Sequence, residues 1–290
     1  MKSPARSPRP GPTDDARRAT RIAAVSYLNT TPMIEGLDIW RDAELITAVP
    51  SRLADMVLKG DADIGLVSLA DYAQADGDLS LLPCGMIGCD GPTLTVRVFS
   101  AVPPDQITTL HADTDSHTSV VLAQLILAER FGVRPRVRDF HARERLGSSD
   151  DADGWPEAML LIGDKVVTDS PPAVRYPHQI DLGEAWHDLT GLPFVYAVWM
   201  CRTDRADDPA VRTAAALIDR QRRRNAMRLD SLITAEAAKR GWPGDLARQY
   251  VGELLRFRVD DRAKEAVDSF LTRAATLGLL PDAHARWAQA

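Results

Sequence analysis

Short apolar runs alternate with a helical pattern over the first quarter of the chain. Residues 22–25 form a continuous apolar run, which is typical of a strand covered on both faces. A second strand is predicted at 45–49 and a third at 62–67, with a helix between them that Pro50 opens and Gly60 ends. Because strand and helix alternate at these spacings, the strands are expected to pair in parallel and to present ligand-binding loops at their carboxyl ends.

A second unit of the same kind follows Pro103-Pro104. Before this break, the polar and apolar residues of 93–101 alternate, which predicts a strand with one wetter face. Residues 142–156 are polar and acidic and are expected to form a surface loop. The other elements are predicted, in chain order, as a strand at 108–112, a helix at 118–131, strands at 136–140 and 158–162, a short helix at 181–189 and a strand at 194–201.

The chain beyond Asp207 is patterned as helix. The predicted helices occupy 208–229, 232–240, 244–256 and 260–277. Two αβ units, joined by strands that cross near Ser100 and Val198, predict an α/β protein of two lobes with mixed sheets, a double hinge and a helical C-terminus. We expect one lobe of 21–100 plus 198–290 and another of 101–197, with a ligand in the cleft between them. This arrangement resembles type II periplasmic binding proteins and the enzymes derived from them.

The composition and the net charge indicate which kinds of binding partner the protein can have. Hydrophobic residues make up 45% of the chain and charged residues 26%, as in ordinary soluble globular proteins. The formal charge is -6, and the first twenty residues carry five positive and two negative side chains, which leaves -9 on the remainder. So acidic a body argues against nucleic acid as the partner.

Residues 1–20 are rich in Pro and Arg and lack the apolar run of a signal peptide, so a disordered leader is expected. No window approaches the roughly 18 apolar residues of a membrane span. Cys84, Cys89 and Cys201 are too sparse for a disulfide framework, and neither they nor the six His show the spacing of metal ligands. The sequence therefore predicts a cytoplasmic protein without metal or membrane. It also lacks GxGxxG, Walker and GxSxG motifs, so nucleotide cofactors and serine-hydrolase chemistry have no support.

Polar residues gather where the first strand ends. Ser26, Tyr27, Asn29 and Thr30 offer hydroxyls, a phenol and an amide just before Pro32. One interpretation is a helix cap with Pro at the first helical position. The other is that Asn29 orients a polar substrate, since its short side chain carries both a donor and an acceptor. The two are compatible, because a capping loop on a rigid scaffold is a common place for binding groups.

A second cluster opens the helix predicted at 118–131. Ser116, Thr118 and Ser119 place three hydroxyls at its start, where unpaired N–H groups and the positive end of the helix dipole favour an anion. A lone Ser here would be a structural cap, and three hydroxyls in four positions make a carboxylate or phosphate site an equal alternative.

Further candidates lie on or after other strands. Gly163 follows a buried strand and would let a ligand approach the backbone, while Asp164 either caps the next helix or reaches into the cleft. Ser68 ends the third strand, and Thr95 lies on the wetter face of its own strand, so both are candidates for contact with a ligand.

An ordered set of motifs runs along most of the chain. It comprises Ser26-Tyr27-Leu28-Asn29-Thr30 with Pro32, Pro50-Ser51 with Leu53-Ala54, Gly60, Asp63-Ile64-Gly65-Leu66-Val67, Gly91-Pro92, Ser116-x-Thr118-Ser119, Ile162-Gly163-Asp164, Asp181-Leu182-Gly183 with Trp186, and Gly191-Leu192-Pro193-Phe194-Val195. The set resembles the chorismate dehydratase family of the futalosine route to menaquinone, from about Arg21 to Leu280. The sister family of 1,4-dihydroxy-6-naphthoate synthases carries Pro and Asn-Asp in the first loop, so Asn29 favours the dehydratases.

The resemblance implies a hydro-lyase that removes water from chorismate and gives 3-[(1-carboxyvinyl)oxy]benzoate. The reaction makes an aromatic ring and needs no cofactor. Either Asp164 takes the proton, or the enolpyruvyl carboxylate of the substrate does so while the protein supplies orientation and excludes water. We favour the second route, because the motifs contain no obvious His or Glu base.

The same resemblance implies roles for the candidate residues. The hydroxyls at 116–119 would hold one carboxylate of the dianionic substrate, and Asn29 would hydrogen-bond the departing hydroxyl or the enolpyruvyl group. The other predicted substrate contacts are Ser26, Tyr27, Thr30, Ser68, Thr95 and Gly163. Two positions depart from the family pattern, since Thr95 stands where Ser is common and Lys165 where an uncharged residue is usual.

Other functions stay open at this point. A lyase like the naphthoate synthases would share the fold, and a protein that binds a small carboxylate without changing it would share the cleft. The lack of an export signal weakens the second alternative. A homodimer is compatible with the sequence.

Overall fold

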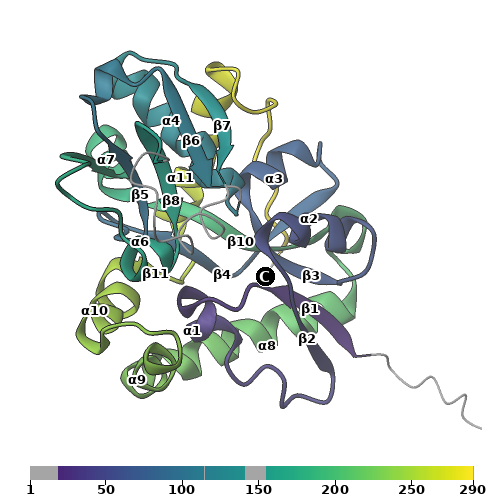
Figure 1. Cartoon of the computed structure of the whole chain (residues 1–290). Coiled ribbons are helices and arrows are strands. Elements are labelled where there is room, and N and C mark those ends of the chain that lie inside the picture. The colour runs from purple at the N-terminus through teal and green to yellow at the C-terminus, as the bar shows by residue number, and fades with distance from the viewer. Residues whose placement is uncertain (1–18, 114, 141–154, 290) are drawn as a thin grey trace, which may run out of the picture.

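The computed structural model describes residues 19–113, 115–140 and 155–289, so the predicted leader and most of the 142–156 loop lie outside the described residues. The first of two mixed sheets has the strand order β11-β4-β10-β3-β1-β2 (Figure 1). Its strands are β1 (Thr20–Ala24), β2 (Ala43–Thr47), β3 (Ile64–Ser68), β4 (Leu79–Cys89), β10 (Phe194–Arg202) and β11 (Leu255–Arg256). β1 pairs in parallel with β2 and β3, which confirms the predicted parallel unit, whereas β10 and β4 are antiparallel.

The second sheet has the order β7-β6-β8-β5-β9. Its strands are β5 (Val96–Ser100), β6 (Thr109–Asp113), β7 (Arg136–Phe140), β8 (Ala158–Ile162) and β9 (His178–Asp181). β6 is parallel to β7 and β8, and β5 is antiparallel to β8 and β9. Both sheets are therefore mixed, as predicted.

Helices cover the sheets and form the C-terminal part of the chain (Figure 1). They are α1 (Thr31–Ile34), α2 (Pro50–Leu58), α3 (Leu69–Gln74), α4 (His117–Phe131), α6 (Lys165–Thr168), α7 (Leu182–Thr190), α8 (Pro209–Ala226), α9 (Leu229–Lys239), α10 (Gly244–Arg248) and α11 (Asp261–Thr276), with a 3-10 turn η1 (Leu28–Thr30) and a π-helical turn η5 (Gln249–Leu254). Ser116 caps α4 by accepting a bond from the Ser119 N–H, and Gly132 ends it in the left-handed region.

Two sequence predictions fail on the first sheet. Strand β4 was not predicted, and the single helix expected at 244–256 is wrong, because the chain there forms α10, then η5, then the edge strand β11. β11 pairs with β4, so both errors concern the same edge of the sheet.

The chain changes sheets twice, and both crossings come earlier than expected. β5 ends at Ser100 but belongs to the second sheet, and β10 starts at Phe194 in the first sheet. The crossings therefore fall at 90–95 and 182–193 rather than near Ser100 and Val198. Sheet membership favours lobe boundaries several residues before those predicted, and the exact boundaries of the two lobes stay a proposal.

One carboxylate ties the two crossing segments together. Asp181 accepts hydrogen bonds from the N–H groups of Thr93 (2.9 Å), Leu94 (2.7 Å) and Gly183 (3.0 Å). Leu94 has φ +72°, a left-handed conformation that is costly for a non-glycine residue. The hydrogen bonds that Asp181 accepts hold the backbone of Leu94 in this conformation, directly before Thr95.

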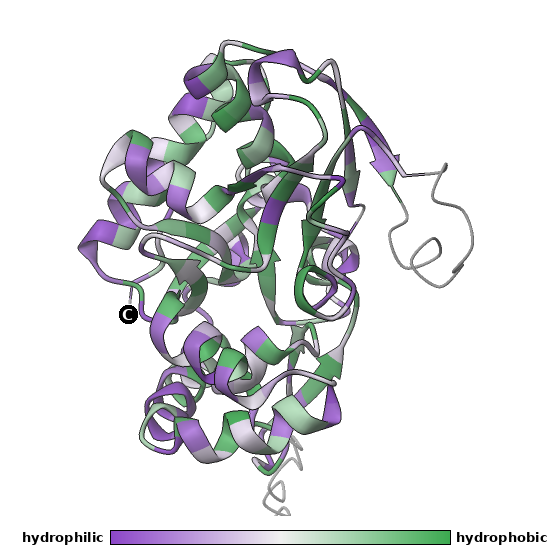
Figure 2. Cartoon of the chain, turned by 60° about the vertical axis from the view of Figure 1, so that its left-hand side comes forward, coloured by the Kyte–Doolittle hydropathy of each residue, from purple (hydrophilic) through white to green (hydrophobic). Residues whose placement is uncertain are grey.

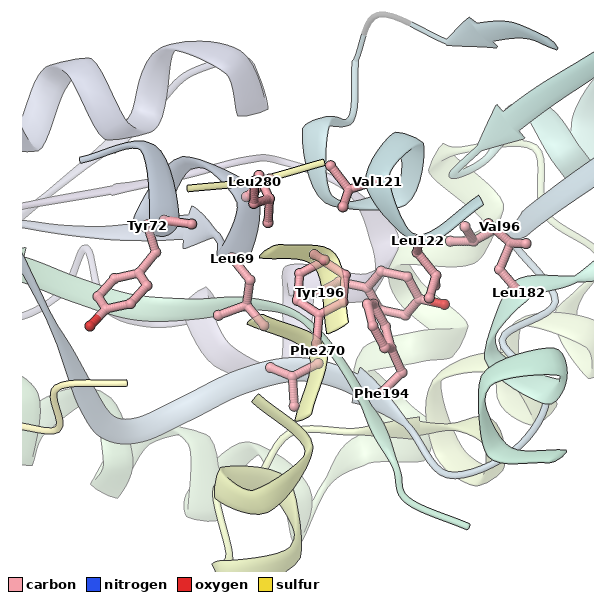
Figure 3. Close-up of a cluster of buried hydrophobic side chains, with 14 of the residues drawn as sticks. Leu69, Tyr72, Val96, Val121, Leu122, Leu182, Phe194, Tyr196, Phe270 and Leu280 are labelled. Atoms are coloured by element: carbon pink, nitrogen blue, oxygen red, sulfur yellow. The ribbon is translucent and has the colours of Figure 1, made fainter. Parts of the chain in front are cut away.

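A continuous apolar core joins the two sheets. It contains buried residues from strands of both sheets, and Figure 3 shows Leu69, Leu122, Phe194 and Phe270 within it, contributed by α3, α4, β10 and α11. The rings of Phe194 and Phe270 meet edge to face with centroids 5.2 Å apart. Figure 2 shows apolar residues concentrated on the inner strands, whereas the outer helices carry both hydrophilic and apolar residues.

Candidate functional site

A cavity with an empty volume of about 770 Å³, including its open mouth, has walls from both sheets. Eight predicted site residues line it, namely Tyr27, Asn29, Ser68, Thr95, Ser116, Thr118, Ser119 and Gly163. The structure thus brings together candidates that lie as far apart as 27 and 163 in the sequence.

Three predicted site residues are not part of the cavity wall. Ser26 is exposed, and its carbonyl accepts a bond from Arg240 (2.7 Å). Thr30 is fully buried, and its hydroxyl lies 2.8 Å from the carbonyl oxygens of Val25 and Tyr27. Thr30 therefore shapes the first loop rather than facing a ligand. Asp164 lies beside the wall, and its side chain does not cap α6.

Tyr250 connects two of the predicted residues. The Thr95 hydroxyl donates to the Tyr250 phenol oxygen (2.7 Å). The Asn29 amide lies near the same phenol and acts to lower its pKa. Burial raises the pKa of Tyr250, so the phenol stays protonated. The Oδ1 of Asn29 is buried and has no partner among the described residues, which leaves it available to a ligand. Tyr250 was not among the predicted site residues.

The start of α4 offers hydroxyls to the cavity. Ser116 Oγ donates to Ser119 Oγ (2.8 Å), while Thr118 Oγ1 accepts from the Ala70 N–H of α3 (3.1 Å). Ser119 and Thr118 each keep a hydroxyl hydrogen that these bonds do not use. Three helix starts meet here, because Pro50-Ser51 of α2 and Ser68 of α3 also line the cavity. Their N–H ends favour an anion.

An Asp–His pair bridges α3 and α4 on the same wall. Asp71 Oδ1 lies 2.6 Å from His117 Nδ1, and the Ser68 hydroxyl donates to the other Asp71 oxygen (2.8 Å). The hydrogen bond to Asp71 raises the pKa of His117 above its usual value, against the effect of burial. Neither Asp71 nor His117 was among the predicted site residues, although Ser68 and Asp71 have the spacing of a capping box.

Gly163 and the first crossing segment (90–95) form a further part of the cavity wall. Gly163 has φ +67°, and no atom lies within 4 Å of the position that a Cβ would take. Its N–H donates to the Thr95 carbonyl (2.8 Å), which fixes both residues at the wall. The Thr93 hydroxyl lies 2.6 Å from the Tyr196 phenol, and Tyr196 sits at a bulge in β10.

The described residues show no Lys or Arg on the cavity wall. The nearby Lys165 is buried, and its ammonium group contacts the carboxylates of Asp113 and Asp115, the latter at 2.9 Å. Lys165 is therefore committed to two carboxylates beside the wall. Over the described ranges, no group of three or more His, Cys, Asp or Glu side chains could hold a metal ion. In the same part of the chain, every helix is too short or too polar to cross a membrane.

The fold and the cavity define a two-lobed protein of the periplasmic-binding-protein architecture. Similar solved structures include a protein of Archaeoglobus fulgidus (15% identity, TM-score 0.70, 90% of this chain and 98% of that one) and a Candida albicans protein described as having the generic periplasmic binding protein structural fold (12%, 0.64, 91% and 92%). The alkanesulfonate-binding protein of Xanthomonas axonopodis, bound to MOPS, is also similar (13%, 0.61, 91% and 94%). At these identities the likeness shows the fold alone.

Sequence relationships identify the family within that architecture. The model of a family described as menaquinone biosynthesis matches residues 20–276. This chain belongs to that family, as the motif set predicted. It is also 27% identical over 267 residues to the chorismate dehydratase of Thermus thermophilus, which covers 87% of this chain and 93% of that protein.

Proposed function

We propose that this protein is a chorismate dehydratase, a hydro-lyase of menaquinone biosynthesis. The observation that carries the proposal is the similarity to the Thermus thermophilus chorismate dehydratase over nearly the full length of both chains. The family match supports a role in menaquinone biosynthesis. The three free, buried cysteines suit a reducing compartment, so we place the enzyme in the cytoplasm.

The elimination is balanced without a cofactor. A proton leaves the ring carbon that bears the enolpyruvyl ether, and the electrons of that C–H bond form the third double bond of the ring. The C–O bond to the neighbouring hydroxyl breaks, and the departing oxygen takes up one proton, equivalent to the one lost from the ring, to become water. No electron enters or leaves, so the protein has to bind, orient and enclose the substrate.

The cavity geometry supports roles for its polar groups. The unpartnered Asn29 Oδ1 accepts a hydrogen bond from the ring hydroxyl, and the Tyr250 phenol holds the amide in place. The hydroxyls of Thr118 and Ser119 donate to one carboxylate at the start of α4. The open side of Gly163 admits the ring close to the backbone.

The carboxylates of the described wall are poorly placed to act as the base. Asp71 is bonded to His117 and Ser68, and Asp115 is paired with Lys165. Asp164, the predicted protein base, lies outside the wall. We therefore propose that the enolpyruvyl carboxylate of the substrate takes the proton, while the enclosed cavity holds the reacting atoms together and excludes water.

Incubation with chorismate tests the function directly. The absorbance of chorismate is expected to fall as that of the aromatic product rises. Asn29→Ala should lower kcat by about 100-fold, because it removes the group that orients the departing hydroxyl. Gln249→Ala is the matched control, since Gln249 is an exposed amide next to Tyr250 in the sequence and should leave the rate unchanged. Tight binding with an unaltered spectrum would instead identify a carboxylate-binding protein.

A further inference from the structure

We propose that His117, oriented by Asp71, binds one carboxylate of the substrate and does so only while its imidazole ring is charged. The inference rests on the proposed function, which makes the substrate a dicarboxylate. It adds a binding residue, and a dependence on pH, to the wall formed by α3 and α4.

The geometry fixes which ring nitrogen meets the ligand. His117 Nδ1 is bonded to Asp71 Oδ1 at 2.6 Å, so Nε2 is the ring nitrogen that remains for a ligand, and His117 lines the cavity. Asp71 is itself held in place, because its other oxygen accepts from the Ser68 hydroxyl and its N–H donates to Ser68 Oγ (3.1 Å). Its side chain is only 9% exposed, against 43% for that of His117. Asp71 therefore orients the ring from beneath while Nε2 remains accessible.

The charge of the wall also points to His117. A dianion needs local positive charge in a partly buried cavity, and the described wall contains no Lys or Arg. Asp115, the other acidic residue of this wall, contacts the ammonium group of Lys165 from α6, which it shares with Asp113. His117 is thus the cationic side chain that the described wall can offer to a carboxylate, beside the hydroxyls of Thr118 and Ser119.

The groups that set the charge of His117 are its near neighbours. Asp71 faces it from α3 and raises its pKa, whereas partial burial lowers it, and the net direction is upward. The other elements packed on α4 place their ion pairs at its far end, where Arg130 meets Asp188 of α7 and Glu129 meets Arg273 of α11. The ring is therefore charged below its raised pKa, and the carboxylate interaction is lost as pH rises through it.

Kinetics test the inference with a matched pair of variants. His117→Asn should lower kcat/KM by about tenfold, mainly through KM, because it removes a charge-assisted hydrogen bond to bound substrate. His187→Asn is the control, since His187 also lies near an aspartate (3.6 Å from Asp90) but away from this cavity. Wild-type kcat/KM should fall as pH rises through the raised pKa of His117, Asp71→Asn should move this fall to lower pH, and His117→Asn should remove it. A His117→Asn enzyme with wild-type KM and pH profile would overturn the inference.

NMR of the His117 ring separates binding from a structural role. Isophthalate serves as an unreactive dicarboxylate, and the ring signal is assigned by its absence in His117→Asn. Saturation with isophthalate should raise the pKa of His117 by about one pH unit. A ligand that binds the charged ring about tenfold more tightly than the neutral ring must raise the ring pKa by that amount. An unchanged ring pKa at saturation would refute the contact. If wild type leaves chorismate intact but isophthalate still shifts the ring, the proposed function fails and the carboxylate site stands.

Discussion

Tyr250 shows how a single side chain links the cavity to the C-terminal helices. Its ring stacks on Trp242 with centroids 5.1 Å apart, and its phenol meets Thr95 and the Asn29 amide. Thr95 leads into the second sheet, whereas Asn29 follows the first strand of the first sheet. The phenol therefore joins groups from both sides of the cavity.

Tyr250→Phe should lower kcat by about 10- to 100-fold with a smaller change in KM, because Asn29 loses the partner that orients it. The change should also destabilise the fold by about 1–3 kcal/mol, since buried polar groups lose a bond. Tyr176→Phe is the matched control: Tyr176 Oη donates to the Pro156 carbonyl (2.7 Å) outside the cavity. Equal kcat losses in the two variants, measured beside their melting temperatures, would argue against an orienting role for Tyr250.

The residues found from sequence share a simple property. Asn29, Ser68 and Gly163 follow strands whose pattern is clear, and the loops after parallel strands meet at one edge of a sheet. Tyr250 and His117 have no such signal. An aromatic residue within an apolar helical pattern predicts a core position, and a lone His at the start of a helix predicts a surface position. Only the packing of distant elements shows that they face the same cavity.

At the scale of elements, the start of α7 is docked tightly on the first crossing segment. A Cβ on Gly183 would lie 2.1 Å from Thr93 Oγ1, 2.5 Å from Cys89 Sγ and 2.6 Å from the Gly91 carbonyl oxygen. One of these atoms belongs to the backbone, so a small side-chain movement cannot relieve the contact. This close approach brings Asp181 within reach of the amides at 93 and 94.

Gly183→Ala should therefore destabilise the protein by about 3 kcal/mol and weaken substrate binding, as the crossing segment shifts away from Asp181. Gly252→Ala is the control: nothing lies within 4 Å of its Cβ position and its φ is not positive, so it should be neutral or slightly stabilising. Urea unfolding of both variants measures the difference. Equal stabilities would show that the segment adapts without cost.

The elements that sequence reasoning missed depend on their partners. β4 contains Pro83 and Gly85, which interrupt a strand pattern, and the pairing with β10 skips residues 82–85 in a bulge that accommodates them. Leu255-Arg256 continues a helical pattern but pairs with β4, so this strand could be predicted only if β4 were known. In contrast, α2 and α4 carry their own start and stop signals and were predicted closely.

For the whole molecule, the α/β class, the mixed sheets and the helical C-terminus were predictable, because two αβ patterns interrupted by extended strands allow few arrangements. The crossing points were displaced because the alternation of 93–101 marks a strand without showing which sheet it joins. β5 lies between β8 and β9, and only this pairing assigns it to the second sheet.

The apolar core of Figure 3 has a consequence for how the protein unfolds. Since Phe194, Phe270 and Leu122 pack in one cluster that includes strands of both sheets, neither half can lose its structure without exposing the interior of the other. We expect a single cooperative heat-absorption peak whose calorimetric and van 't Hoff enthalpies agree, despite the two-lobed shape. Phe270→Leu should lower the temperature of this peak without splitting it. Two resolved peaks in scanning calorimetry would mean that the halves are thermodynamically independent.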